Sequence, residues 1–297
     1  MFHKPVMLKE CMEALEIKPS GKYVDVTFGG GGHSRAILDQ LNSEGRLYAF
    51  DQDKDAVKNK FNDERLIFVP QNFRHLRRFL KVYDAHSIDG ILADLGISSH
   101  QIDTPERGFS IRYEAKLDMR MDASLEKTAA DILNSYSSEQ LQNIFSSYGE
   151  LRNSKTLAEL IVKERLVTPF TTTTDFISRI ESCIRGHRPR YLAQVFQALR
   201  MEVNQEMNSL EELMKQSSEV LSKGGRMAVL TYHSLEDRMV KNFFKAGNAS
   251  GEEVKDLFGH SEKIFTLVNK KPITAAEEEI KENPRARSAK LRIAIKN

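Results

Sequence analysis

The sequence predicts an α/β protein in which a mainly parallel β-sheet is interrupted by an all-helical insertion. Residues 20–103 alternate short apolar runs with segments of helical spacing, which is typical of consecutive βα units. The following stretch has helical stripes and no convincing strand, after which the α/β alternation returns. We therefore divide the chain into a first part of the sheet domain at 1–103, an insertion at 104–204 and a second part of the sheet domain at 205–297.

Four strands are expected in the first part, and two of them are followed at once by an acid. The strands are expected over residues 22–27, 47–50, 66–69 and 88–93, with a helix over 33–41 after the first strand. Asp51 comes directly after the second strand, and Asp94 directly after the fourth. In open α/β sheets the ligand crevice lies outside the carboxyl ends of the strands, so both acids are candidates for ligand binding.

The insertion is expected to be helical because its apolar residues recur at i, i+3, i+4 and i+7. In the clearest run, through Leu141 to Tyr148, we expect Ser138 as the N-cap and Gly149 as the C-terminal stop. The remaining expected elements are helices over 157–161, 176–184 (capped by the threonines at 171–174), 192–199 and 207–221, a Gly224-Gly225 turn, and strands over 226–231, 263–268 and 291–295.

The composition describes a globular protein without an obvious partner. Of 297 residues, 40% are hydrophobic, which is enough for a full core, and no apolar stretch is long enough to cross a bilayer or to act as a signal peptide. We therefore expect a cytoplasmic protein. Cys11 and Cys183 have no metal-ligand or disulfide spacing. The net charge of +2, from 44 basic and 42 acidic residues, means that nucleic-acid binding would have to rest on local clusters.

Four consecutive glycines, residues 29–32, stand between the first strand and its helix. Such a loop lets the backbone approach a ligand closely, and Asp51 stands where an acid accepts hydrogen bonds from both ribose hydroxyls of an adenosine cofactor. An NAD-dependent dehydrogenase would use the same acid, but the G-x-G-x-x-G pattern fails, with Ser34 or Arg35 in place of its last glycine. S-adenosylmethionine (SAM), which has no pyrophosphate, fits better, and the dinucleotide stays the alternative.

At nearly full length the sequence resembles the bacterial small-subunit ribosomal RNA (cytosine-N4) methyltransferases, the RsmH or MraW family. The resemblance is carried by ordered motifs at residues 3–6, 25–34, 94–101, 107–110, 117–122, 196–200, 233–238 and 283–288. It implies a class I SAM-methyltransferase core, which is Rossmann-like, with an inserted helical domain that helps to hold RNA. The implied substrate is a cytidine in the decoding centre of 16S rRNA. Among the departures, Lys116 stands where the family commonly has proline and Tyr232 where it commonly has phenylalanine.

The resemblance also implies individual cofactor contacts. Gly31, Gly32 and His33 match the loop around the methionine end of SAM. The other matching residues are Asp51 for the ribose, Phe73 beside the adenine, and Asp94 and Gln101 on the sulfonium side.

Methylation of an exocyclic amine depends mainly on alignment, because the SAM methyl group is already activated by the sulfonium. An acceptor for the amine hydrogens assists and later takes the proton. Asp94 is our candidate for this role, the alternative being a helix cap or a cofactor contact only. His233 is a second candidate, for substrate positioning, although the run 233–238 could instead build a helix start and ion pairs. The aspartates at 118 and 122 are interpreted as a structural clamp, since methyl transfer needs no metal.

Several arginines are candidate RNA contacts, because three basic runs flank the predicted cleft: one in the insertion, one near its start and one near the end of the chain. They are Arg107, Arg120, Arg185, Arg188, Arg190, Arg200, Arg238, Arg285 and Arg287. A solvated charged loop is the alternative for each run. The expected partner is small-subunit rRNA or the assembled small subunit, with a homodimer as a further expectation and no membrane. An RNA-binding ribosome-assembly factor that keeps the fold without turnover is the second alternative function.

Overall fold

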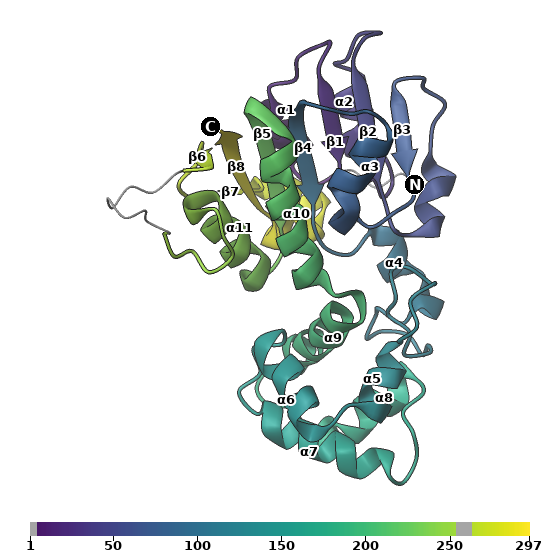
Figure 1. Ribbon diagram of the computed structural model, residues 1–297. Coiled ribbons are helices and arrows are strands. Elements are labelled where there is room, and N and C mark those ends of the chain that lie inside the picture. Colours follow the sequence, from purple (N-terminus) through teal and green to yellow (C-terminus); the bar gives the residue numbers. More distant parts are fainter. Residues whose placement is uncertain (1–4, 254–262) are drawn as a thin grey trace. The chain divides into compact units, whose positions relative to one another are not determined.

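The computed structural model describes residues 5–253 and 263–297, so His3 and Lys4 of the first motif lie outside the described residues. The chain forms two compact units (Figure 1). The first joins Met1–Gly96 to Met207–Asn297, and the second comprises Ile97–Glu206. The sequence patterns predicted these divisions at 103/104 and 204/205. In the described ranges, no helix is long and apolar enough to span a membrane.

The first unit is built on a sheet that has eight strands in the described part of the chain. Their order is β3-β2-β1-β4-β5-β8-β6, with β7 paired to β8. The strands are β1 (Lys22–Asp25), β2 (Arg46–Phe50), β3 (Leu66–Val69), β4 (Ile88–Asp94), β5 (Leu221–Thr231), β6 (Phe265–Leu267), β7 (Ile273–Thr274) and β8 (Lys290–Lys296). The first five pair in parallel, whereas β8 runs antiparallel to β5. The predicted α/β class with a Rossmann-like sheet is confirmed.

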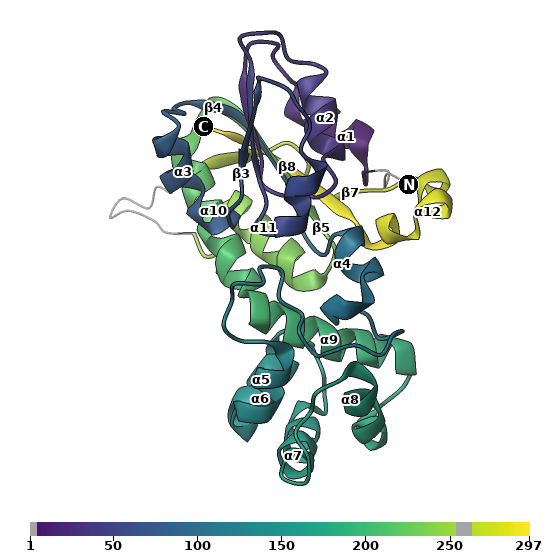
Figure 2. The same ribbon diagram turned by 90° about the vertical axis from the view of Figure 1, so that its right-hand side faces the viewer.

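Helices of the first unit cover both faces of this sheet (Figure 2). They are α1 (Leu8–Leu15), α2 (Gly32–Leu38), α3 (Leu76–Val82), α10 (Glu206–Val220), α11 (Ser234–Ala246) and α12 (Glu277–Glu282), with 3-10 turns η1 (Lys54–Asn59), η2 (Phe73–His75) and η5 (Pro284–Ser288). Side chains of α1 and α2 share a buried cluster with one face of the strands, and those of α3, α10 and α11 share a second cluster with the other face. The strand ends are therefore the part of the sheet that the helices leave available for a ligand.

Two element boundaries differ from the sequence prediction for local reasons. The first strand ends at Asp25 and not at residue 27, because the Asp25 carboxylate accepts the Thr27 amide hydrogen bond at 3.0 Å and turns the chain. The Gly224-Gly225 turn is wrong as a boundary, since β5 continues through it. The pairing register between β4 and β5 shifts at that point, so the glycines interrupt the ladder without ending the strand.

The second unit is helical and has its own apolar core. Its helices are α4 (Ser99–Asp103), α5 (Ala129–Ser135), α6 (Ser138–Ser147), α7 (Ser154–Arg165), α8 (Thr173–Arg179) and α9 (Arg188–Asn204), with 3-10 turns η3 (Pro105–Arg107) and η4 (Glu181–Cys183). The predicted threonine cap is confirmed, because Thr172 caps α8. The predicted Ser138 cap is wrong by one residue: Ser137 caps α6, in a capping box with Gln140.

Candidate active site

Three carboxylates lie at the same edge of the sheet. Asp25 ends β1, Asp94 ends β4 and Asp51 follows β2 directly. Because β2, β1 and β4 are parallel neighbours, their carboxyl ends meet at this edge. The sequence singled out Asp51 and Asp94 but not Asp25, because Asp25 fell inside the strand expected over 22–27 and ends it only in the structure.

The glycine loop between β1 and α2 is shaped by close contacts. The Gly29 amide donates to Asp51 Oδ2 at 2.7 Å, and Gly31 has a φ of +77°. A Cβ at Gly31 would lie 2.8 Å from the Phe61 ring, and one at Gly32 would overlap Pro5. Side chains are therefore excluded at residues 31 and 32, where the backbone itself lines the loop.

Asp51 is oriented by the backbone around it. Oδ2 accepts from Gly29 N, and Oδ1 accepts from Asp53 N at 2.8 Å. Burial raises the pKa of the Asp51 carboxyl to about 6, against the lowering effect of these two bonds. Each carboxylate oxygen can accept a further hydrogen bond, so the two together suit a pair of neighbouring hydroxyls.

Asp25 and Asp94 are linked through Thr27. Thr27 N donates to Asp25 Oδ1, while its Oγ1 accepts from the Asp94 amide at 2.8 Å. Ser34 Oγ donates to the other oxygen of Asp25 at 2.7 Å. Burial raises the pKa of both carboxyls, and the charge of Asp25 raises the pKa of Asp51 and Asp94 further. The three carboxyl groups lie at one edge, so a bound cation would favour their ionised forms.

His33 faces Asp94 from the start of α2. Its Nε2 lies 3.0 Å from the Val6 carbonyl oxygen, which can only accept, so Nε2 carries a proton. Nδ1 then lies 3.7 Å from Asp94 Oδ2, and in the neutral ring it is an acceptor. The Asp94 side chain is 24% exposed, whereas His33 is buried. Oδ2 and Nδ1 together are suited to a group that brings N–H hydrogens.

The other implied cofactor contacts fall in different places. Phe73 is half-buried in η2, just beyond the carboxyl end of β3 and packed against the apolar core. Gln101 belongs to the second unit, where its side chain accepts from Ser98 N at 3.1 Å in a capping box. The structure thus brings Gly31, Gly32 and His33 together with the strand-end acids at one edge.

His233 caps α11. Its Nδ1 accepts from the Glu236 amide, and Glu236 Oε2 accepts from the Tyr232 amide at 2.8 Å. Asp237, one residue further on, pairs with Arg292 at 2.6 Å. These contacts favour the interpretation of run 233–238 as a helix start with ion pairs over the role of His233 in substrate positioning.

Three of the candidate RNA arginines are used inside the second unit. Arg200 is 8% exposed and forms a two-pronged pair with Glu206, at 2.7 and 2.8 Å. Arg120 pairs in the same way with Asp118, which is one half of the predicted clamp, whereas Asp122 accepts hydrogen bonds from Ser124. Arg107 donates to the carbonyl oxygens of residues 120 and 121. In these contacts the three arginines stabilise the helical unit.

Other candidate arginines are at the surface. Arg185, Arg188 and Arg190 are exposed before and within the first turn of α9, although Arg188 also pairs with Glu181 at 2.9 Å. In the first unit, the exposed candidates are Arg238 and Arg287, while Arg285 is half-buried.

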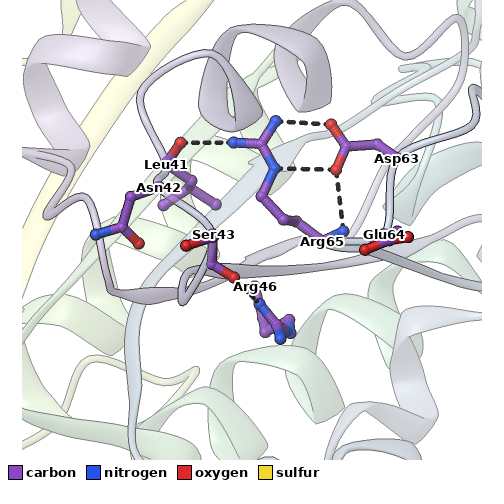
Figure 3. A pocket seen from close by; sticks show the side chains of 7 residues that line it. All are labelled: Leu41, Asn42, Ser43, Arg46, Asp63, Glu64 and Arg65. Carbon is purple, nitrogen blue, oxygen red and sulfur yellow. Dashed lines mark hydrogen bonds and ion pairs between the residues drawn. The ribbon is translucent and has the colours of Figure 1, made fainter.

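A pocket of about 430 Å³ lies at the opposite, amino-terminal ends of β2 and β3 (Figure 3). It is lined by Leu41, Asn42, Ser43, Arg46, Asp63, Glu64 and Arg65. Arg65 is held by both Asp63 oxygens and by the carbonyls of Leu38 and Leu41, and Arg46 by two loop carbonyls. The guanidinium groups of Arg46 and Arg65 therefore stabilise the loops around the pocket. The pocket lies away from the strand-end acids.

The chain is similar in sequence to known proteins over its full length. The ribosomal RNA small subunit methyltransferase H of Cytophaga hutchinsonii is 54% identical over 99% of both chains, and that of Phocaeicola vulgatus is 53% identical over 100% of this chain and 98% of the other. Solved structures are more distant: an rRNA methylase from Streptococcus thermophilus has a TM-score of 0.41 at 12% identity, over 100% of this chain and 98% of that one. Residues 1–297 match the model of the MraW methylase family, and the chain belongs to that family.

Proposed function

We propose that the protein transfers the methyl group of SAM to the N4 amine of a cytidine in small-subunit ribosomal RNA. The observation that carries this proposal is the edge where Asp25, Asp51 and Asp94 surround a glycine loop. The full-length relatives, which are named ribosomal RNA small subunit methyltransferase H, support the RNA substrate.

The charge of the edge fits SAM better than a dinucleotide. SAM carries a sulfonium, an ammonium and one carboxylate, and is a net cation, whereas NAD brings a pyrophosphate. A cation at this edge would stabilise the ionised forms of three carboxyls whose pKa values are raised by burial, whereas a pyrophosphate would disfavour those forms. Asp51 would hold the ribose hydroxyls, Phe73 would lie beside the adenine, and the loop at Gly31 would receive the methionine end.

Asp94 and His33 would orient the reacting amine. When bound, SAM supplies a methyl group already activated for attack. Asp94 Oδ2 and His33 Nδ1 accept the amine hydrogens, which turns the nitrogen lone pair toward the methyl carbon. Asp94 would take the proton that the amine releases as it gains the methyl group.

The helical unit would hold the RNA. Arg185, Arg188 and Arg190 at the start of α9 are exposed and suited to phosphate contacts. The decoding-centre cytidine, the choice between free RNA and the assembled subunit, and a cytoplasmic location belong to the same proposal. The homodimer stays a prediction.

Transfer of a labelled methyl group from SAM tests the proposal. We expect incorporation into small-subunit RNA, offered free and as the assembled subunit, and loss of one N4-methylcytidine from cells that lack the gene. Binding of SAM and RNA without transfer would instead indicate an assembly factor. Calorimetric binding of NAD without binding of SAM would indicate a dehydrogenase.

A further inference from the structure

Tyr232 makes a direct hydrogen bond to the candidate acceptor. Its Oη donates to Asp94 Oδ1 at 2.5 Å. The two residues come from neighbouring parallel strands, because Asp94 at the end of β4 is in register with Leu230 of β5. Tyr232 follows just beyond the end of β5.

The tyrosine is held on both sides of this bond. Its amide donates to Glu236 Oε2, which fixes its backbone to the first turn of α11. Its ring packs against Gly96, where an added Cβ would lie 3.2 Å from the ring and φ is +110°. The hydroxyl thus reaches Asp94 from a fixed position.

We propose that Tyr232 is a positioning residue for methyl transfer: its hydroxyl occupies Asp94 Oδ1 and thereby turns Asp94 Oδ2 toward the substrate amine. This inference rests on the proposed function, since it requires Asp94 to accept the amine hydrogens. A carboxylate that rotates freely would offer either oxygen in several orientations. The tyrosine removes that freedom, and it leaves the oxygen beside His33 Nδ1 for the substrate.

The bond also affects the charge state of Asp94. Burial, and then the charges of Asp25 and Glu236, raise the pKa of Asp94, whereas the hydrogen bond from the Tyr232 hydroxyl lowers it, as a protonated His33 ring would. Burial first, and then the charges of Asp94, Cys11 and Glu236, raise the pKa of Tyr232, so the phenol keeps its proton and stays a donor. Removing the hydroxyl should therefore raise the pKa of Asp94, and the ionised acceptor should be lost at a higher pH.

Tyr232→Phe tests the proposal, because it keeps the ring over Gly96 and removes only the donor. We expect kcat to fall about tenfold, the size of one charge-assisted hydrogen bond, with the Kd for SAM within twofold of wild type. The acidic limb of the kcat profile should move to higher pH. Tyr83→Phe is the matched control, since Tyr83 is exposed on the surface of the same unit.

A carboxyl NMR titration of the protein without substrate tests the Tyr232–Asp94 contact independently of methyl transfer. A higher pKa for Asp94 in Tyr232→Phe supports the contact even if the wild type does not methylate RNA, which would overturn the proposed function alone. If the wild type is active and Tyr232→Phe keeps both its kcat and its acidic limb, the positioning role is wrong.

Discussion

The two units place their candidate functional groups in opposite environments. In the sheet unit these groups are carboxylates at strand ends, fixed by backbone amides and by Thr27, with pKa values raised by burial. In the helical unit they are arginines, of which Arg107, Arg120 and Arg200 stabilise the fold. The arginines near the start of α9 are exposed, although Arg185 donates to two loop carbonyls and Arg188 pairs with Glu181. The sheet unit is suited to holding one small molecule in one orientation, and the helical unit to long-range attraction of a polyanion. Substitutions in one unit should therefore leave the task of the other intact.

The largest effect is expected from Asp94→Asn. Loss of the acceptor should lower the single-turnover rate at saturating SAM by about 100-fold or more, the range of general-base catalysis, with RNA affinity unchanged. Asp89→Asn, at the amino end of the same strand, is the control. An unchanged rate would remove Asp94 from the chemistry.

Asp51→Ala should weaken SAM binding by about 2 to 4 kcal/mol, because two charge-assisted hydrogen bonds to the ribose are lost. Calorimetry measures this, and RNA binding should stay within twofold of wild type. If SAM bound the variant as tightly as the wild type, the sheet unit would not hold the cofactor through this acid.

Lower pH should weaken SAM binding in the wild type. The carboxyl of Asp51, with its pKa raised to about 6, accepts well only when ionised, so affinity is present above that value and is lost as pH falls through it. We expect about tenfold weaker binding at pH 5 than at pH 7.5. Asp51→Asn, measured over the same range, should lose this pH dependence of SAM binding. If the variant kept it, the titrating group would be Asp25 or Asp94.

The smallest effect is expected from Arg185→Gln, Arg188→Gln and Arg190→Gln together. RNA affinity should fall several-fold at moderate salt, and the slope of log affinity against log salt should flatten by about two units, since each lost phosphate contact removes about 0.7 to 0.9. The matched triple lysine variant should keep the slope. If the triple glutamine variant also bound SAM more weakly, the two units would not have separate roles.

The sequence could predict what depends on neighbours in the chain. Asp51 and Asp94 were visible because an acid directly follows an apolar strand, and the glycine loop because four glycines have no helical or strand propensity. The Tyr232 to Asp94 bond was not visible, because it depends on the register between β4 and β5. The need for glycine at residue 31 depends likewise on Phe61, which lies in the loop between η1 and β3. His233 was singled out from its motif, but its role as the cap of α11 became visible only from its contacts with Glu236 in the structure.

The insertion of the helical unit between β4 and β5 also affects how the chain folds. These strands are neighbours in the sheet, yet the chain leaves the sheet unit after Gly96, re-enters it at Met207 and reaches β5 only at Leu221. Closing so long a loop costs conformational entropy before the pairing is gained. The helical unit has its own apolar core and many local contacts, so we expect it to form first and to shorten the free loop. Pulsed hydrogen exchange should then protect the amides of α6 and α9 before those of β5, and the site at Asp94 would be completed only when β5 joins β4.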